Sequence, residues 1–377
     1  MKLNGELNGY RITTKPTNDG AGKCLWAFAE KDGAQYFVKE FLDPKRPRPE
    51  SMGDAAAKQQ LLAQCEDFER RHWSVIDRLD PDDLDAGNLV TAVDFFFVGT
   101  RYYKVTRRLD PVDLDPHTLS DRQKSVLLGT LLDSLALLHR LDIVHSDLKP
   151  QNILLHRPPG SDLLTAKLID FDDAYVSGQP PGRQVIGGDA MYASPEWIRY
   201  AGNDSGTGPG RMTTASDLFA LGLIVHQYLT GALPAYDPAY ASPAGAVNAR
   251  RQPVPDPRLQ SQIDRLVRQS LSADPAVRPD ATQWLPVIAQ EYTVGLRSPA
   301  REPAPGHPAS RLRISFATER TATRPAIPIP PTASRNEDGG VEDSYCPAPA
   351  EPPSGSPPSR LRINIRGRTP ADRHPCS

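Results

Sequence analysis

The feature that most constrains this chain is a short polar stretch between apolar neighbours, residues 143–155. Apolar residues precede this stretch, and an apolar, strand-like run follows it at residues 153–155. Asp147, Lys149 and Asn152 therefore share one loop between two segments that a fold would bury. A carboxylate, an ammonium and an amide held together in this way must satisfy one another or a common ligand.

A second carboxylate, Asp170, ends another apolar, strand-like segment further along the chain. Asp170 can share a metal ion with Asn152, since carboxylate and amide oxygens are ligands that Mg²⁺ accepts. Phosphoryl transfer needs a carboxylate for the acceptor hydroxyl, cations for the developing charge, and metal ligands that fix the phosphates. The order and spacing of these four side chains favour that chemistry over a set of unrelated solvated turns.

The pattern of expected secondary structure divides the folded part of the chain in two. We predict strands at residues 10–14, 24–30, 34–41, 89–97 and 101–106, a hairpin turn at 31–33, and a helix at about 55–79. Beyond these we predict helices at 122–141, 215–230, 260–270 and 282–292. The order predicts an α+β fold, with a β-rich first lobe to about residue 106, a helical second lobe to about residue 296, and a cleft between them.

From residue 297 onward the chain is rich in proline and lacks apolar periodicity, which predicts a disordered tail over 297–377. Two near-identical stretches interrupt this tail, one from Arg311 to Ile314 and the other from Arg360 to Ile363. Arginine that alternates with leucine or isoleucine suits an edge strand whose apolar face docks on a partner. The alternative is a chance duplication in a biased linker.

Composition sets limits on partners and location. The 377 residues carry a net charge of −2, which gives no general attraction to nucleic acid or anionic lipid. No apolar run is long enough to cross a bilayer, and the N-terminus lacks the apolar stretch of a signal peptide. The four cysteines have no metal-ligand spacing. We therefore expect a cytoplasmic protein with free thiols.

With these motifs in view, residues 8–296 resemble a bacterial serine/threonine protein kinase of the eukaryotic-like type. The resemblance implies that Asp147 is the catalytic aspartate and that Lys149 is the lysine of the serine/threonine-specific branch. It implies that Asn152 and Asp170 hold Mg²⁺, with Mn²⁺ as an alternative, and that ATP is the phosphoryl donor.

The first lobe contributes the nucleotide-binding residues that the resemblance implies. Lys39 corresponds to the lysine that grips the α- and β-phosphates of the nucleotide. Its partner is expected on the following helix, where Glu69 shares a face with apolar residues. Glu66, one turn earlier, is the alternative.

Gly20 and Gly22 correspond to the loop that covers the phosphates, although Leu25 stands where a third glycine is usual. Thr106, at the end of the strand 101–106, is expected to bind the nucleotide as well. Phe37 stands where a small alanine usually lies over the adenine, so its ring could narrow the pocket or stack on the base.

The second lobe shows further matches to the family. Glu196 ends a segment that resembles the close of the activation loop, and the resemblance pairs it with Arg278. Asp217 corresponds to the aspartate that braces the catalytic loop. Phe171 and Trp73 are expected to stack in an apolar column that links the lobes.

Three further residues depart from the family pattern. Ser146 replaces the arginine that reads a phosphate on the activation loop, and that loop offers only Tyr175 and Ser177 as acceptors. We therefore predict a kinase that is active as synthesised or is controlled by a partner. Asp172 replaces a glycine that lets the backbone flip, which could hold the metal aspartate in one state. Asp189 replaces a threonine and would repel Asp147 unless Lys149 lies between them.

Two other classes of function remain as alternatives. A kinase-like scaffold could bind ATP without transferring phosphate, and the sparse glycine loop with Asp172 and Asp189 favours that alternative. A small-molecule phosphotransferase would share the catalytic loop but lack the Glu196–Arg278 platform for peptides. The resemblance also suggests partners of such kinases: a metal-dependent phosphatase, a protein with an integrin-type adhesion domain, and protein substrates that the arginine-leucine repeats could recruit.

Overall fold

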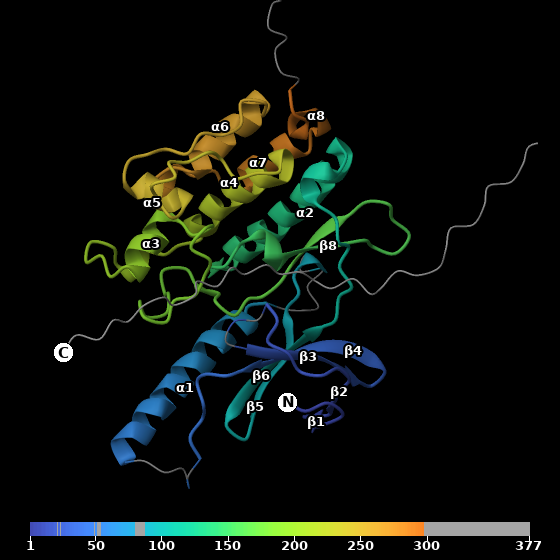
Figure 1. The fold of residues 1–377 in the computed structure, drawn as a ribbon, viewed down its shortest axis with the longest axis vertical. Helices are drawn as coiled ribbons and strands as arrows, with labels where there is room; N and C mark the ends of the chain where they lie inside the picture. The colour runs from blue at the N-terminus through green and yellow to red at the C-terminus, as the bar shows by residue number, and fades with distance from the viewer. Residues whose placement is uncertain (21, 23, 49, 51–53, 80–86, 298–377) are drawn as a thin grey trace, which may run out of the picture. The chain divides into compact units, whose positions relative to one another are not determined.

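The computed structural model describes residues 1–297 except 21, 23, 49, 51–53 and 80–86. These residues belong to one structural unit, Met1–Pro299. The tail, with the docking segments expected at residues 311–314 and 360–363, lies outside the described residues. The predicted α+β fold, a β-rich lobe followed by a helical lobe, is confirmed (Figure 1).

The first lobe is built on a six-stranded antiparallel sheet in the order β1-β2-β3-β4-β6-β5. The strands are β1 (Glu6–Leu7), β2 (Tyr10–Ile12), β3 (Cys24–Lys31), β4 (Ala34–Phe41), β5 (Ala92–Val98) and β6 (Arg101–Arg107). Asp32 and Gly33 form the predicted hairpin turn between β3 and β4, with positive φ angles of 52° and 75°. Such two-residue turns match the twist of the strands that they join.

The two faces of this sheet serve different purposes, because successive side chains on a strand point in opposite directions. One face buries a cluster that includes Ile12, Ala27, Val38 and Val105. The opposite face carries Lys39 and the aromatic rings near it. Lys39 therefore stands on a strand with a packed layer behind it.

Helix α1 (Ala55–Ile76) begins at Asp54, whose side chain accepts a hydrogen bond from the Ala57 amide at 2.6 Å. The helix buries Cys65 and Phe68 against aromatic side chains of the sheet, in a cluster with Phe41, Phe95 and Tyr102. Aromatic packing of this kind fixes which side of α1 faces the sheet. The charged residues of the helix are distributed over its remaining sides.

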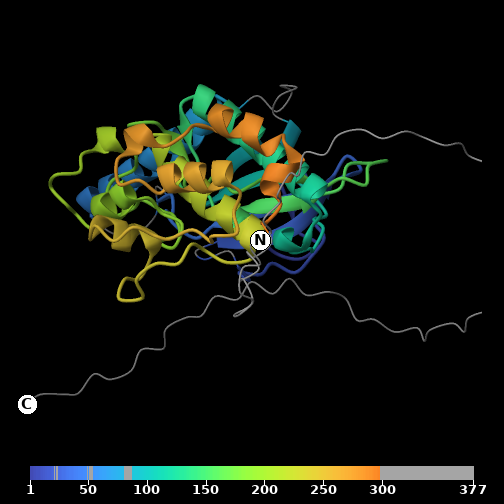
Figure 2. The same ribbon diagram turned by 90° about the horizontal axis from the view of Figure 1, so that it is seen from above.

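The second lobe is helical, and Figure 2 shows it from above. Its helices of four residues or more are α2 (Asp121–Arg140), α3 (Pro195–Ala201), α4 (Ala215–Thr230), α5 (Pro243–Asn248), α6 (Ser261–Ser270), α7 (Ala281–Ile288) and α8 (Glu291–Val294). Helix α4 is buried on nearly all sides, as its almost continuous apolar sequence requires. At Gly222 it approaches α6 so closely that an added Cβ would lie 2.6 Å from Cβ of Ser270.

The last helix differs from the prediction. Residues 282–292 were expected to form one helix, but α7 ends before α8 begins, and Gln290 between them has extended backbone angles. The hydroxyl of Thr293 donates to the carbonyls of Val287 and Gln290 at 2.5 and 2.7 Å. These bonds satisfy carbonyls at the break, so the interruption leaves them with partners.

Two small sheets hold the loops between the lobes. Strand β7 (Ile143–Val144) pairs with β10 (Tyr175–Val176), and β8 (Ile153–His156) pairs with β9 (Thr165–Leu168). The polar stretch identified in the sequence runs from β7 to β8 through a short 3₁₀ turn, Pro150–Asn152. Both of its ends are thereby fixed. Within the described residues, no helix is long and apolar enough to span a membrane.

Candidate active site

The loop between β7 and β8 is closed on itself by hydrogen bonds. Asn152 Nδ2 donates to the main-chain oxygen of Asp147 and to its Oδ2, both at 2.8 Å. Lys149 Nζ lies 3.0 Å from Asp147 Oδ1 and 2.8 Å from Oδ2. The structure thus brings the three side chains of this loop together, and the carboxylate of Asp147 is restrained from two directions.

Asp217, in the first turn of α4, braces the loop. Its Oδ2 accepts from the His145 amide at 2.8 Å, and its Oδ1 accepts from the Ser146 amide at 3.1 Å. Two successive amides therefore point at one carboxylate, next to a residue, Ser146, whose φ is positive at 67°. Asp217 is buried, so these charge-assisted bonds form away from water and hold the loop firmly.

Asp170 follows β9 and reaches the same region. The amide of Ile169 donates to the carbonyl of Asn152 at 3.0 Å, which places the two expected metal ligands on adjacent chain segments. Asp170 has a positive φ of 65°, and its Oδ1 accepts from Lys39 Nζ at 2.7 Å. Side chains from β4, the catalytic loop and the end of β9 therefore converge.

The expected pairing of Lys39 with Glu69 is wrong. Oε1 of Glu69 accepts from the Tyr102 hydroxyl at 2.5 Å and pairs with the guanidinium of Arg46. Glu66, the alternative, is exposed. The segment after β4 supplies a guanidinium to α1, and a guanidinium together with a phenol satisfies a carboxylate well. Lys39 has a different second partner, Oδ2 of Asp172, at 2.6 Å.

Four charged groups share one buried cluster: Lys39, Lys104, Asp170 and Asp172. Burial would raise the pKa of Asp172, but the ammonium groups of Lys104 and Lys39 hold it well below its usual range. Burial, together with the charge on Asp172, raises the pKa of Asp170. Burial would lower the pKa of Lys39, yet the two carboxylates raise it above its ordinary value. The cluster therefore balances two cations against two carboxylates.

The turn before β3 contains the two predicted glycines. Gly20 and Gly22 have positive φ angles of 69° and 55°, where a side chain would introduce strain. Trp26 Nε1 donates to the carbonyl of Asp19 at 2.9 Å and ties the start of this turn to β3. The turn is thus anchored, and its conformation is one that glycine favours.

Aromatic rings cover the sheet face that carries Lys39. Phe37 stands directly opposite Phe28 on β3 and Thr106 on β6. The rings of Trp26 and Phe37 are stacked, with centroids 5.4 Å apart and planes inclined by 27°. Thr106 is half-buried beside them. A flat aromatic surface of this kind suits the stacking of another planar ring.

The apolar column between the lobes contains only one of its two expected members. Phe171 packs on His145, with ring centroids 5.1 Å apart, and belongs to the same buried cluster as Val75 of α1. Trp73 is 42% exposed and packs edge-on against Phe95, so its predicted place in the column is wrong. Residues two apart on a helix do not share a face, and Val75 occupies the inward position instead.

A buried ion pair anchors the first turn of α3. Arg278 donates to Oε1 and Oε2 of Glu196 at 2.7 and 2.8 Å, and neither side chain is exposed. Ser216 donates to the same carboxylate at 3.0 Å. Burial would raise the pKa of Glu196, but the hydrogen bonds and charge of Arg278 lower it. The carboxylate is therefore held in its charged form.

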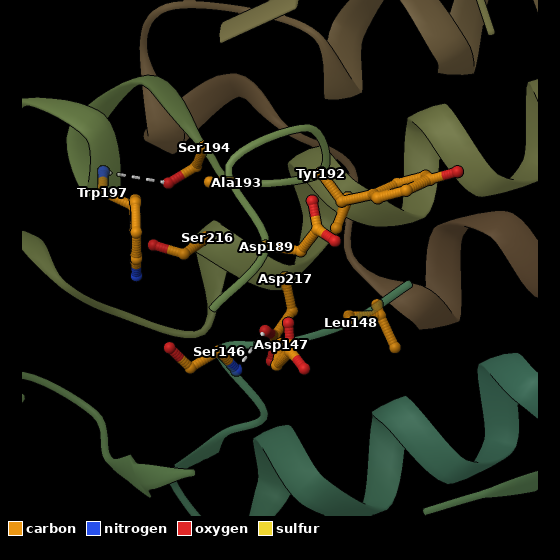
Figure 3. A pocket seen from close by; sticks show the side chains of 11 residues that line it. Ser146, Asp147, Leu148, Asp189, Tyr192, Ala193, Ser194, Trp197, Ser216 and Asp217 are labelled. Atoms are coloured by element: carbon orange, nitrogen blue, oxygen red, sulfur yellow. Dashed lines mark hydrogen bonds between the residues drawn. The ribbon is translucent and has the colours of Figure 1, made fainter. Parts of the chain in front are cut away.

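Asp189 lies beside the catalytic loop without direct contact with Asp147. Lys149 Nζ is 2.8 Å from Asp147 Oδ2 and 3.8 Å from Asp189 Oδ2, so the ammonium lies between the two carboxylates. The Asp189 side chain also accepts from the Met191 amide at 2.9 Å. Figure 3 shows both carboxylates in a pocket that Tyr192 and Trp197 also line.

The expected activation loop, between Asp172 and Met191, is held by hydrogen bonds that involve no phosphate. Arg183 donates to the carbonyls of Tyr200, Asp204 and Thr207 at 3.0, 3.0 and 2.6 Å. Trp197 Nε1 donates to the carbonyl of Gly187 at 3.2 Å. Tyr175, one of the two acceptors expected on this segment, is only 1% exposed. The segment therefore has contacts that do not depend on phosphorylation.

Sequence reasoning missed four charged side chains: Lys104, Arg46, Arg71 and Arg183. A signal for Lys104 was available, since it stands between Tyr103 and Val105 and falls on the same side of its strand as Thr106. Arg71 and Arg183 act on groups far away in sequence, and nothing in the local pattern marks them. The missed residues are all cations near carboxylates or carbonyls whose positions depend on tertiary structure.

The fold and the site together define a protein of the kinase class, because Lys39, Asp170 and the loop that carries Asp147, Lys149 and Asn152 converge on one region. Residues 82–287, more than half of the chain, match the protein kinase domain. The chain therefore belongs to the protein kinase family. The match begins after Lys39 and α1, and it includes Lys104, Asp170 and Asp172.

Curated relatives agree with this assignment and point to the bacterial, eukaryotic-like serine/threonine kinases. The chain is 26% identical over 235 residues to the serine/threonine-protein kinase pkn3 of Myxococcus xanthus, covering 59% of this chain and 38% of that protein. It is 29% identical over 250 residues to PknL of Mycobacterium tuberculosis, covering 63% and 57%. A match to dkf-2 of Caenorhabditis briggsae is 35% identical over 116 residues, covering 31% and 9%. The chain spans less than two thirds of the length of these relatives.

Proposed function

We propose that the protein is a kinase that transfers the γ-phosphoryl group of ATP to serine or threonine hydroxyls of protein substrates. The observation that carries this proposal is the convergence of Asp147, Lys149 and Asn152 in one hydrogen-bonded loop beside Asp170. Each of these residues provides a group that phosphoryl transfer requires. The names of the relatives, all serine/threonine-protein kinases, support the same acceptor class.

The donor set fits Mg²⁺ bound together with phosphate oxygens. Asn152 uses Nδ2 for Asp147, which leaves its Oδ1 for a metal ion. Asp170 uses Oδ1 for Lys39, which leaves Oδ2. Among the described residues, no group of three or more His, Cys, Asp or Glu side chains could hold a metal alone. Mg²⁺ commonly takes one or two protein oxygens and completes its shell with phosphates and water.

The side chains of the loop have distinct tasks in transfer. Asp147 Oδ1, the carboxylate oxygen that Asn152 does not bind, is placed to orient an acceptor hydroxyl and receive its proton. Lys149 lies next to this carboxylate and can stabilise negative charge as it develops on the transferred group. Lys39 orients the donor phosphates. When bound, ATP supplies the phosphoryl group, and the divalent ion neutralises charge on its phosphates.

A protein acceptor is favoured over a small molecule by the segment around Glu196. The buried pair with Arg278 fixes this segment beside the pocket that contains Asp147. A small-molecule phosphotransferase has no need of such a platform. Tyr192 and Trp197 at this pocket offer apolar surface for a peptide side chain next to the reacting hydroxyl.

The test is transfer of labelled phosphate from ATP, with Mg²⁺, to the protein itself and to a generic basic protein. Asp147→Asn should lower the rate by about 10²- to 10⁴-fold, the usual contribution of a positioned proton acceptor. Nucleotide binding, measured by calorimetry, should remain because Asp147 does not contact Lys39 in the structure. If Asp147→Asn transferred phosphate as fast as the wild type, the assignment would fail. Silence of the wild type with intact ATP binding would favour the scaffold alternative.

A further inference from the structure

Lys39 has two carboxylate partners, and both come from one short segment of the second lobe. Its Nζ lies 2.7 Å from Asp170 Oδ1 and 2.6 Å from Asp172 Oδ2. The side chains of Lys39 and Asp172 are only 11% and 15% exposed. Asp170 is needed for the metal ion. Asp172 is therefore the partner that Lys39 can keep when Asp170 turns to another ligand.

Asp172 also resolves a clash between two cations on the sheet. Lys39 on β4 stands directly opposite Lys104 on β6, where like charges destabilise a strand pair. Asp172 receives Lys39 at Oδ2 and Lys104 at Oδ1, so each oxygen takes one ammonium. This arrangement fixes the carboxylate at both ends. A carboxylate fixed in this way restrains the position of the Lys39 ammonium.

Helix α1 provides no carboxylate for Lys39. Its acidic residues are Glu66, Asp67 and Glu69. The first is exposed, the second pairs with Arg70 at the surface, and the third is bound by Arg46 and Tyr102. The α1 side chains within electrostatic reach of Asp172 are Arg71 and His72, and neither is a carboxylate. A helix glutamate that faced Lys39 would place a negative charge near the lysine, whereas α1 places a positive charge, that of Arg71, near Asp172.

We propose that Asp172 is the positioning residue for Lys39, in place of a carboxylate on α1. This inference rests on the proposed kinase function, since it concerns how Lys39 is oriented toward the donor phosphates. The anchor of Lys39 then belongs to the segment that carries the metal-binding Asp170. Correct placement of Lys39 depends on that segment and on Lys104, and not on the position of α1.

The experiment uses the full chain and three variants: Asp172→Asn, Asp172→Gly and Glu69→Gln. Asn keeps the size of the side chain without its charge, and glycine is the residue that related kinases usually have here. For each protein we would measure kcat and KM for ATP, and the Kd of a non-hydrolysable ATP analogue by calorimetry. Both Asp172 variants should lower kcat at least about tenfold, the effect of losing one buried charge-assisted hydrogen bond.

Nucleotide affinity separates positioning from general damage. The Kd should change by less than about threefold in both Asp172 variants, since removing a carboxylate does not weaken attraction for phosphate. Glu69→Gln should keep kcat within about twofold of the wild type. An Asp172→Gly variant as active as the wild type would overturn the inference, as would a Glu69→Gln variant as impaired as Asp172→Asn or a Kd that rises more than about tenfold. If the wild type transferred no phosphate, the proposed function would be refuted, and the inference that rests on it would fall as well.

Discussion

Replacing Arg278 by methionine should destabilise the second lobe by much more than the loss of a surface ion pair. The Arg278 guanidinium donates to both oxygens of Glu196 at 2.7 and 2.8 Å, to the Ala215 carbonyl at 2.7 Å and to the Ser272 carbonyl at 3.1 Å. Both members of the ion pair have 0% side-chain exposure. Methionine fills similar volume but donates nothing, so a charged carboxylate and two carbonyls would lose a donor in the interior.

The magnitude follows from that burial. Removing one partner of a buried, hydrogen-bonded ion pair typically costs about 3–5 kcal/mol, because the other charge is left uncompensated. Arg268 provides a matched control, since its pair with Asp264 is on the surface, with 52% and 27% side-chain exposure. Arg268→Met should cost less than about 1 kcal/mol. Urea unfolding followed by circular dichroism would give both values.

A double variant tests the cause of the loss. Glu196→Leu in the Arg278→Met background removes the stranded carboxylate, so it should recover part of the free energy of unfolding. If the loss of unfolding free energy in the double variant equalled the sum of the losses in Arg278→Met and Glu196→Leu, the two residues would act independently. If Arg278→Met cost less than about 1 kcal/mol, the reasoning from burial would be refuted.

Three further predictions concern other parts of the fold. Gly222→Ala should lower the free energy of unfolding by about 1–3 kcal/mol, because the added Cβ would collide with Ser270. Gly129→Ala on α2, where an added Cβ meets nothing within 4 Å, should instead raise the free energy of unfolding by about 0.5–1 kcal/mol. Calorimetric melting of the two variants would measure both effects. Burial lowers the pKa of His72 to about 3, so between that value and about 6.5 the unfolded state alone binds the proton. The free energy of unfolding therefore falls as the pH drops through this window, by up to about 1.4 kcal/mol per pH unit. His72→Phe should lack this dependence in urea titrations at pH 5 to 7, and an equal slope in both proteins would contradict it. In Asp217→Asn the side chain has one uncharged oxygen, so it can accept a hydrogen bond from only one of the two loop amides. The variant should lower kcat at least about tenfold with little change in KM for ATP. An unchanged kcat would show that activity does not depend on these hydrogen bonds.

The residues of the catalytic loop could be predicted because their chemistry is local. Asp147, Lys149 and Asn152 lie within a few residues, and the apolar flanks of the loop fix their surroundings. The strands and helices of both lobes followed from apolar periodicity for a similar reason. The pair of Glu196 with Arg278 was predictable only through the resemblance, since 82 positions separate its members.

The partner of Lys39 could not be predicted in this way. Helical periodicity indicates which side chains of α1 share a face, but it does not show which cation competes for a given carboxylate. Arg46, on the segment after β4, takes Glu69, and that contact depends on how the segment folds over the helix. Asp172 was noted as a departure from a glycine, and its effect was sought in backbone freedom. Its charge matters more, because two lysines from neighbouring strands meet there.

The aromatic face beside Lys39 contains Trp26, whose intrinsic fluorescence can report on binding there. Trp26 stacks on Phe37, and its indole N–H is bonded to the turn that contains Gly20 and Gly22. Indole emission responds to the polarity and motion of its surroundings, so a purine settling against Phe37 would change the signal of Trp26. The other three tryptophans lie elsewhere: Trp73 on the outside of α1, Trp197 at the pocket that contains Asp147, and Trp284 in the core of the second lobe. A chain with Trp73 and Trp197 replaced by phenylalanine would therefore allow donor binding to be followed in real time without a label.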